Sequence, residues 1–254
     1  MKNKQNNELA VCGFAAVKEL EKKSPERIRR LYFTADKAPL FGGLCRKLAE
    51  KHGIYNQVSS EDLQKLCGTV HHEGVVAMVK PPQILHLNSD IVDEWCRNLE
   101  SVLYLDNVGN TNNFGAIIRS AAFFGIKNII IPESNNQATI STSTYRIAKG
   151  GMEYVNIYSI QNPEFFFNDI DTRIIKVGTD VNGSIPISKL RELSDESKKK
   201  PLMVILGNEE TGISDFIKKH CDYLVTIPTP EKNLDSLNVA QACSIICYEL
   251  SKNF

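Results

Sequence analysis

Short apolar runs separated by polar loops dominate the second half of the chain. Residues 202–206 and 223–227 are almost entirely apolar and have the length of buried strands. A polar loop follows each run, at residues 207–213 and at residues 230–240. Continuous apolar strands are typical of parallel sheets, in which ligands bind at the carboxyl edge. We therefore expect both loops to leave one edge of a sheet and to border a binding site.

Residues 101–131 add a strand, a polar loop, a helix and a second strand, which is the pattern of a βαβ unit. Asn113 is a suitable N-cap for the helix, and Gly125 is a suitable terminator. Arg119 is the one charged residue among the apolar positions of this helix. Because an unpaired buried guanidinium is very costly, Arg119 must emerge at a cleft or bind a partner. A surface position or a structural ion pair is the alternative.

The first eighty residues predict a separate small α/β/α domain. Apolar runs at residues 28–33 and 74–79 indicate strands, and helical patterns occupy residues 40–52 and 61–66. Pro81 and Pro82 begin a linker, because proline disfavours continuation of a central strand. The predicted division is therefore a domain at residues 1–80, a linker at 81–97 and a second domain at 98–254. We expect Trp95 to anchor the first helix of the second domain.

The two predicted domains differ in net charge. The chain has 30 basic and 30 acidic residues, but its first eighty residues hold 14 basic against 9 acidic ones, and the remainder holds 16 against 21. The basic excess of +5 suits attraction to a polyanion such as RNA, or belongs to a solvated helix surface. An apolar content of 42% and a charged content of 24% exclude a disordered or fibrous chain.

The cysteines and the hydropathy pattern indicate the cellular compartment of the protein. The seven cysteines form no C-x-x-C pair and no zinc spacing, which indicates reduced thiols, a cytoplasmic location and no bound metal. We expect no signal peptide and no membrane association, since no apolar run is long enough to cross a bilayer.

The loop at residues 207–213 restricts the chemical class of ligand that can bind there. Gly207 and Gly212 flank Glu209 and Glu210, and two carboxylates would repel a pyrophosphate or triphosphate. The chain contains neither G-x-G-x-x-G nor G-x-x-x-x-G-K-[ST]. A ligand without phosphate and with some positive charge fits better, and S-adenosylmethionine, which carries a sulfonium, is one. An acidic surface turn ahead of a helix is the alternative.

Three ordered motifs together give a much more specific signal. The first motif, N-x-G-A-x-x-R-[ST]-A, is matched by Asn113, Gly115, Ala116, Arg119, Ser120 and Ala121. The second, G-x-E-x-x-G-[ILM] after a strand, is matched by Gly207, Glu209, Gly212 and Ile213. The third, I-P followed by S-L-N-V, is matched by Ile227, Pro228, Ser236, Leu237, Asn238 and Val239. In these motifs and their order, residues 101–252 resemble the SpoU/TrmH family of RNA 2′-O-ribose methyltransferases, within the SPOUT group.

A further segment, V-H-H-x-G-V-V-A at residues 70–77, resembles an uncharacterised branch of that family. The resemblance implies an α/β fold, with a parallel-sheet SPOUT domain whose carboxyl-terminal end forms a trefoil knot. A small α/β/α domain, similar to a ribosomal protein and able to bind RNA, would precede it. The implied reaction transfers a methyl group from S-adenosylmethionine to a ribose 2′-hydroxyl of tRNA or rRNA. A homodimer formed through the knotted domain is also implied.

The resemblance also implies roles for individual residues. Those with a catalytic role are Arg119, Asn113, Glu209, Ser236 and Asn238. Those that bind the cofactor are Gly207, Asn208, Thr179, Ile227, Leu237 and Asn238. For Arg119 the family offers two roles, a general base and a phosphate anchor. We favour the anchor, because a guanidinium stays protonated and binds phosphate bidentately.

The chain departs from the family pattern in two places. Residues 229–235 lack the glycine that usually follows the third motif's proline, and Asn112 stands where a histidine is common. Two other hypotheses therefore stay open, namely an RNA-binding maturation factor without turnover and an unrelated nucleotide-handling α/β protein. The motifs name neither the RNA nor the nucleotide.

Overall fold

The computed structural model describes residues 2–3, 7–196, 200–230 and 236–251. The chain divides into two compact units. Residues 1–83 and 139–154 form what we call the amino-terminal unit, and residues 84–138 and 155–254 form the carboxyl-terminal unit.

The amino-terminal unit is built on a five-stranded mixed sheet with the order β1-β2-β5-β3-β4. Its strands are β1 (Lys2–Asn3), β2 (Glu8–Cys12), β3 (Ile28–Phe33), β4 (Ile54–Gln57) and β5 (Val75–Val79). Its helices include α1 (Phe14–Lys23), α2 (Gly42–Glu50) and α3 (Ser60–Cys67). Leu63 and Cys67 of α3 pack against one face of β2 and β5. Every residue of β5 is buried, so both faces are covered, as the α/β/α prediction requires.

Residues 139–154 belong to this unit although they are distant from it in sequence. They contain helix α6 (Thr142–Ala148) and the 3₁₀ turn η3 (Gly151–Glu153). Arg27 Nη1 lies 3.1 Å from Glu153 Oε1, and the Glu153 side chain is only 2% exposed. Arg27 also donates to the Tyr145 hydroxyl. Because a buried carboxylate without a partner is strongly destabilising, this ion pair fixes where the segment packs.

The carboxyl-terminal unit contains an eight-stranded sheet with the order β11-β13-β10-β12-β7-β8-β9-β6, in which all the paired strands are parallel. The strands are β6 (Leu85–His86), β7 (Val102–Leu105), β8 (Asn128–Pro132), β9 (Asn156–Ile160), β10 (Ile175–Thr179), β11 (Ile185–Pro186), β12 (Leu202–Leu206) and β13 (Tyr223–Thr226). The helices are α4 (Ser89–Asn98), α5 (Thr111–Phe123), α7 (Pro163–Asp169), α8 (Leu190–Glu196), α9 (Asp215–His220) and α10 (Val239–Ser251). The parallel-sheet prediction is confirmed, and β12 has the predicted limits.

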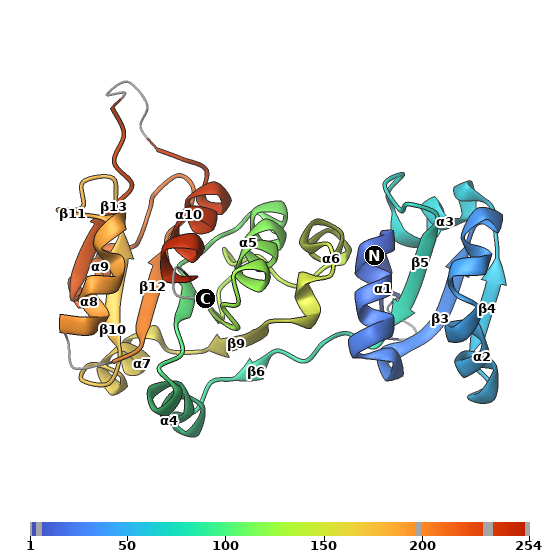
Figure 1. Cartoon of the computed structure of the whole chain (residues 1–254), viewed down its shortest axis with the longest axis horizontal. Helices are drawn as coiled ribbons and strands as arrows, with labels where there is room; N and C mark the ends of the chain where they lie inside the picture. The colour runs from blue at the N-terminus through green and yellow to red at the C-terminus, as the bar shows by residue number, and fades with distance from the viewer. Residues whose placement is uncertain (1, 4–6, 197–199, 231–235, 252–254) are drawn as a thin grey trace. The chain divides into compact units, whose positions relative to one another are not determined.

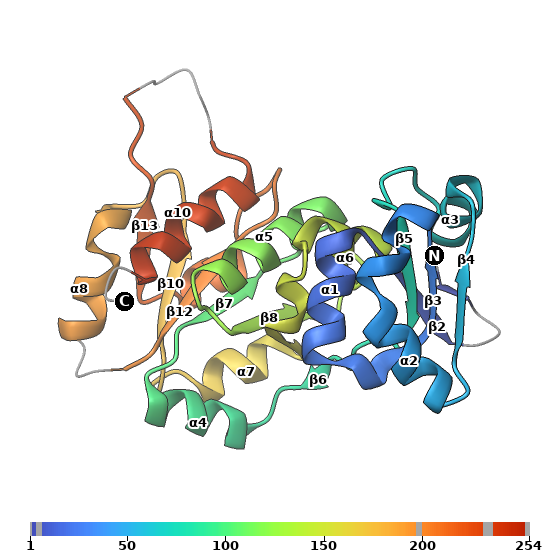
Figure 2. The ribbon, with the colours of Figure 1, turned by 45° about the vertical axis from the view of Figure 1, so that its right-hand side comes forward.

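Helices cover both faces of this sheet (Figures 1 and 2). Helices α5 and α10 lie side by side on one face, joined by a 2.8 Å hydrogen bond between the Ser120 and Ser244 hydroxyls. Helices α4 and α7 lie on the other face. Their apolar side chains and those of α9 form one core with the strands. Trp95 of α4 is buried in that core, as predicted. Residues 89–97 were predicted as the end of the linker, and they lie in α4 of this unit.

The beginning of α5 differs from the prediction. Asn110 is the N-cap, and its side-chain oxygen accepts hydrogen bonds from the amides of Asn112 at 2.8 Å and Asn113 at 3.3 Å. The prediction of Asn113 as the cap is therefore wrong, and Asn113 lies inside the first turn. Gly125, with φ of 74°, follows the end of the helix, and its predicted role as terminator is confirmed.

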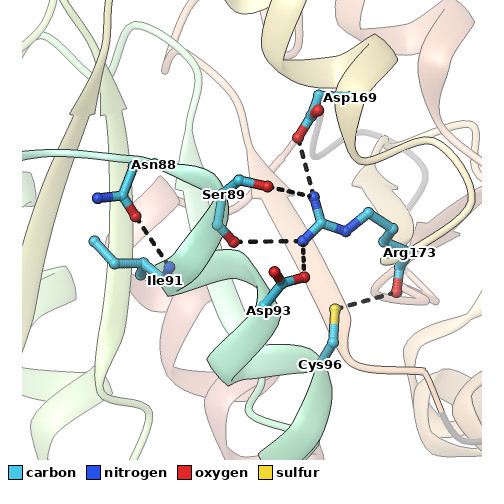
Figure 3. Close-up of polar contacts among 7 residues, drawn as sticks. All are labelled: Asn88, Ser89, Ile91, Asp93, Cys96, Asp169 and Arg173. Carbon is cyan, nitrogen blue, oxygen red and sulfur yellow. Dashed lines mark hydrogen bonds and ion pairs between the residues drawn. The ribbon is translucent and has the colours of Figure 1, made fainter.

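Arg173 joins α4 to the end of α7 (Figure 3). Its guanidinium contacts Asp93, lies 3.1 Å from Asp169 Oδ2 and donates to the Ser89 hydroxyl at 3.2 Å. Cys96 Sγ lies 3.6 Å from the Arg173 carbonyl oxygen. These contacts hold the first helix of the unit against its neighbour.

We expect Arg173→Ala to lower the free energy of unfolding by about 1 kcal/mol, because two partly exposed ion pairs are lost and such pairs contribute roughly 0.2–1 kcal/mol each. Chemical denaturation followed by circular dichroism measures the change. Arg97→Ala is the matched control, since Arg97 is an exposed arginine on α4. Equal effects of the two substitutions would contradict the structural role of Arg173.

Candidate methyl-transfer site

Four neighbouring strands end where the motif residues lie. In the order β13-β10-β12-β7, these strands are parallel, so their carboxyl ends meet at one edge. The residues that follow β13, β12 and β7 are Ile227, Gly207 and Asp106, and Thr179 is the last residue of β10. The expectation that two loops leave the same sheet edge is confirmed.

The loop at residues 207–213 is a closed turn organised by Asn208. The backbone groups of Asn208 and Gly212 exchange two hydrogen bonds of 2.9 Å each. The Asn208 side-chain oxygen accepts from the amides of Glu210 and Thr211, and its side-chain nitrogen donates to the Asn107 carbonyl at 2.9 Å. Asn208 therefore shapes the loop and ties it to the end of β7.

Gly207 is required by close backbone approach. A Cβ added there would lie 2.1 Å from the carbonyl carbon of Gly212 and 2.2 Å from the Ile213 nitrogen, which no side chain can accommodate. Gly212, with φ of 70°, adopts the left-handed conformation that favours glycine. Gly207 thus has a steric reason to be glycine, and Gly212 has a backbone conformation that favours it.

One hydrogen-bonded chain connects the three motifs. Asn113 Nδ2 donates to Glu209 Oε1 at 2.6 Å, and Asn238 Nδ2 donates to Asn113 Oδ1 at 3.2 Å. Asn238 Oδ1 in turn accepts from the Ala240 amide at 2.9 Å, at the beginning of α10. Because an amide side chain can both donate and accept, Asn113 lies between the other two in a fixed orientation. Segments separated by about a hundred residues therefore meet at one polar centre.

Arg119 lies on the surface of α5. Its side chain is exposed, and it has no hydrogen-bond or ion-pair partner among the residues that the structure describes. A structural ion pair, one of the alternatives for this arginine, is therefore not found in the described part of the chain. An exposed guanidinium is available to bind an external anion.

The remaining predicted site residues lie around the same edge. Thr179 uses its hydroxyl to donate to the Ile205 carbonyl at 2.8 Å, which links the ends of β10 and β12. Ile227 is half-buried, and Ser236 and Leu237 are exposed ahead of α10. Residues 231–235, within the loop that departs from the family pattern, lie outside the described residues.

Asp106 is a site residue that the sequence reasoning missed. It is only 4% exposed, and its carboxylate accepts from the Ser214 amide at 2.7 Å and from Asn107 Nδ2 at 2.8 Å. Asp106 therefore connects the loop after β7 to Ser214, the residue that precedes α9. Its position directly after an apolar strand was the available signal.

Two kinds of feature are absent from the described residues. No cluster of three or more histidine, cysteine or carboxylate side chains there could hold a metal ion. None of the helices in the described ranges combines the length and the apolar character needed to span a bilayer.

Comparison with protein families gives two matches that together span most of the chain. The model of the SpoU rRNA Methylase family matches residues 100–248. A second model, RNA 2′-O ribose methyltransferase substrate binding, matches residues 10–85. The first match contains all three motifs, and the second lies in the amino-terminal unit except for its last two residues.

Individual proteins that are similar to this chain are also RNA methyltransferases by name. A 23S rRNA (guanosine-2′-O-)-methyltransferase, RlmB, of Acinetobacter baylyi is 31% identical over 93% of this chain and 94% of its own length. An uncharacterized tRNA/rRNA methyltransferase of Haemophilus influenzae is 34% identical over 97% of this chain and 67% of its own length. Among solved structures, an AdoMet-bound rRNA methyltransferase from Sinorhizobium meliloti has a TM-score of 0.75 at 20% identity, covering 99% of this chain and 89% of that one. At that identity the structural likeness concerns the fold.

Proposed function

The chain belongs to the SpoU rRNA methylase family, and from this premise we infer that it transfers a methyl group from S-adenosylmethionine to a ribose 2′-hydroxyl of RNA. One observation carries the inference. The hydrogen-bonded chain Asn238–Asn113–Glu209 unites the three family motifs at one sheet edge. A nucleotide-handling protein of another kind has no need to bring these residues together.

The residues at this edge fit S-adenosylmethionine. The turn at residues 207–213 has no lysine, and it carries two carboxylates, which favour a cationic ligand over a phosphate. We assign cofactor binding to Gly207, Asn208, Thr179, Ile227, Leu237 and Asn238. Bound there, the cofactor supplies a methyl group on a positively charged sulfur. We also propose that the loops after β12 and β13 form the trefoil knot that the family resemblance implies.

The catalytic residues act by positioning and charge. Arg119 binds an RNA phosphate through its guanidinium, since phosphate is the anion that a bidentate donor matches. Asn113 and Asn238 keep Glu209 in a fixed orientation beside the ribose, and Ser236 contributes a hydroxyl from the loop ahead of α10. Holding two reactants in line removes much of the entropic barrier to group transfer.

We propose a guanosine of 23S rRNA as the substrate nucleotide. The support is the relative of Acinetobacter baylyi, which matches over almost its whole length. In the amino-terminal unit, Arg46 and Lys47 of α2 and the following Lys51 are exposed, and they supply positive charge to an RNA backbone. We also propose a cytoplasmic location, which is supported by an RNA substrate and by seven cysteines without a disulfide bond.

A homodimer is proposed through the face formed by α5 and α10. Phe123 is 82% exposed and Tyr248 is 52% exposed, and both rings contact Phe124 at centroid distances of 5.0 and 6.1 Å. An exposed aromatic cluster of this kind is typical of an interface. A second copy is the occupant that the family resemblance implies.

Phe123→Asp is expected to convert the dimer to a monomer, because it places a charge in the centre of the apolar contact. Sedimentation velocity at micromolar protein concentration measures the mass. Phe165→Asp is the matched control, since Phe165 is 72% exposed on α7, on the opposite face of the sheet. A wild type that is monomeric, or a Phe123→Asp variant that stays dimeric, would contradict this assignment.

Labelled methyl transfer into separated RNA classes tests the proposed function. The purified protein is incubated with tritiated S-adenosylmethionine and with rRNA or tRNA from a strain that lacks this gene. We expect label in the large-subunit rRNA, at a guanosine. Label in tRNA alone would overturn the choice of substrate. Binding of cofactor and RNA without any transfer would instead favour an RNA-maturation factor without turnover.

A further inference from the structure

The loop between β7 and α5, at residues 106–110, connects two sides of the proposed methyl-transfer site. The Asn107 carbonyl accepts at 2.9 Å from Asn208, which belongs to the closed turn after β12. Asn110 caps α5, and the first turn of that helix contains Asn113. The position of the loop therefore sets where Asn113 lies relative to the turn after β12.

The loop depends on tertiary contacts for its shape. Residues 106–110, all of which the structure describes, form neither helix nor strand. Asn107 has a φ of 58°, a left-handed conformation that is uncommon outside glycine. Its side chain donates to Asp106 at 2.8 Å and accepts from the Ser134 hydroxyl at 2.6 Å. Ser134 belongs to the segment that follows β8, so that segment holds one end of the loop.

Gln137, in the same segment, supports the middle of the loop. Its side-chain oxygen accepts from the Val108 amide at 3.1 Å, and its side-chain nitrogen donates to the Val108 carbonyl at 3.2 Å. The Ala138 amide donates to the same carbonyl at 2.9 Å. Val108 is fully buried, so no water can replace these partners. One side chain thus pairs with both backbone groups of Val108.

Gln137 can influence the site only through this loop. It is 6% exposed, and its side-chain nitrogen also donates to the Ala138 carbonyl at 3.4 Å, so both of its N–H groups are in use. A side-chain amide is uncharged and can accept and donate at once, which neither a carboxylate nor a hydrocarbon can do. Because buried backbone groups without partners are costly, loss of the amide would make the loop shift.

We propose that Gln137 is a positioning residue for methyl transfer, a proposal that rests on the proposed function. By fixing Val108, it holds the loop between the turn after β12 and the first turn of α5. Asn113 then lies within hydrogen-bond distance of Glu209, and Arg119 of the same helix keeps its place for the RNA phosphate. Small displacements of such groups lower turnover strongly, because group transfer requires the reactants in line.

Gln137→Met tests the proposal in the full-length protein, because methionine has a similar length but lacks the amide. We expect kcat for methyl transfer to fall by about tenfold to a hundredfold. KM for S-adenosylmethionine should stay within about threefold, because the turn after β12 keeps its own hydrogen bonds between Asn208 and Gly212. Steady-state kinetics with tritiated cofactor, at a temperature where circular dichroism shows a folded variant, measure both quantities.

Asn128→Leu is the matched control for this substitution. Asn128 is also a buried amide, at 1% exposed, and its side chain donates to Glu100 at 2.7 Å. It is the first residue of β8, so it lies at the amino ends of the parallel strands, away from the proposed site. Asn128→Leu should lower the melting temperature as Gln137→Met does, but it should leave kcat within about twofold of the wild type.

Gln137→Glu gives a second test, which also decides the question if Gln137→Met does not fold. The introduced carboxylate cannot donate, and the two backbone carbonyl oxygens that it faces favour its protonated form. Once protonated, the carboxyl group again offers one donor and one acceptor. The ratio of kcat in Gln137→Glu to kcat in the wild type should therefore rise as the pH is lowered. A ratio that stays low at every pH would contradict the proposal.

The Asn113 side chain reports the proposed effect directly. Its amide signals in proton–nitrogen NMR spectra should shift in Gln137→Met, because the hydrogen bond to Glu209 changes, and stay in place in Asn128→Leu. An active wild type whose turnover survives Gln137→Met, or whose Asn113 signals do not move, overturns the positioning role alone. A wild type that transfers no methyl group to any RNA contradicts the proposed function, and the Asn113 signals then still decide whether Gln137 holds the site.

Discussion

Arg119→Ala is expected to lower methyl transfer to RNA by a factor of about 100 to 1000, the range found when one charged or hydrogen-bonding stabiliser is removed from an active site. Its guanidinium is exposed and has no partner among the described residues, so its loss leaves the fold intact. Affinity for S-adenosylmethionine should stay within about twofold, because no hydrogen bond or ion pair joins Arg119 to a described residue that is assigned to the cofactor. Single-turnover kinetics with labelled cofactor and calorimetric titration measure the two quantities.

Two further variants serve as controls for the Arg119→Ala substitution. Arg119→Lys keeps the charge but loses the bidentate donor, so we expect an intermediate rate. Lys127→Ala removes an exposed cation from the same unit and should have little effect. Full methyl transfer by Arg119→Ala would remove Arg119 from the mechanism.

Gly207→Ala is expected to weaken S-adenosylmethionine binding by roughly tenfold to a hundredfold, the equivalent of the 1–3 kcal/mol typical of overpacking. The new methyl group would lie 2.1 Å from the Gly212 carbonyl carbon, so the turn must open. Opening breaks the paired hydrogen bonds between Asn208 and Gly212 and moves Glu209 away from Asn113. Both cofactor affinity and the melting temperature should fall.

Gly43→Ala is the matched control for this substitution. Gly43 lies in helix α2, and a Cβ there meets nothing within 4 Å. Alanine in that position should leave cofactor binding unchanged and stabilise the helix slightly. Wild-type cofactor affinity in Gly207→Ala would show that the turn at residues 207–213 does not form the cofactor site.

Local patterns predicted the strands and the βαβ unit well, and the reason is physical. Residues 202–206 are buried on both faces of the sheet, so an unbroken apolar run is the pattern that this environment requires. The N-cap of α5 was harder to predict, because Asn110 and Asn113 both have suitable side chains. Asn110 caps the helix by accepting from the Asn113 backbone amide. The Asn113 side chain is therefore free to donate to Glu209.

Tertiary contacts account for what the sequence could not predict. The packing of residues 139–154 with the amino-terminal unit depends on Arg27, which pairs with Glu153 across 126 positions of sequence. The role of Asp106 depends on a hydrogen bond to the Ser214 backbone, which no side-chain pattern signals.

The candidate site was predictable because the three motifs resemble those of a known family, and two of the motif residues also have a local physical reason to be present. Gly207 permits a close backbone approach, and Asn113 both donates and accepts. Their meeting at one edge follows from the parallel direction of the strands, which the apolar runs indicated, and from the strand order, which only the structure gives. The positions of Ser236 and Leu237 followed from the motif alone, and both are exposed in the single chain.

The most direct measurement is the chemical identity of the methylated product. RNA labelled by the wild-type protein is digested completely to nucleosides, and the radioactive nucleoside is separated by chromatography and identified by mass spectrometry. A methyl group on the ribose, in 2′-O-methylguanosine, is the predicted result, and it should disappear with Arg119→Ala. A methyl group on a base, or no labelled nucleoside from any cellular RNA, would contradict the assignment of this sheet edge to ribose methylation.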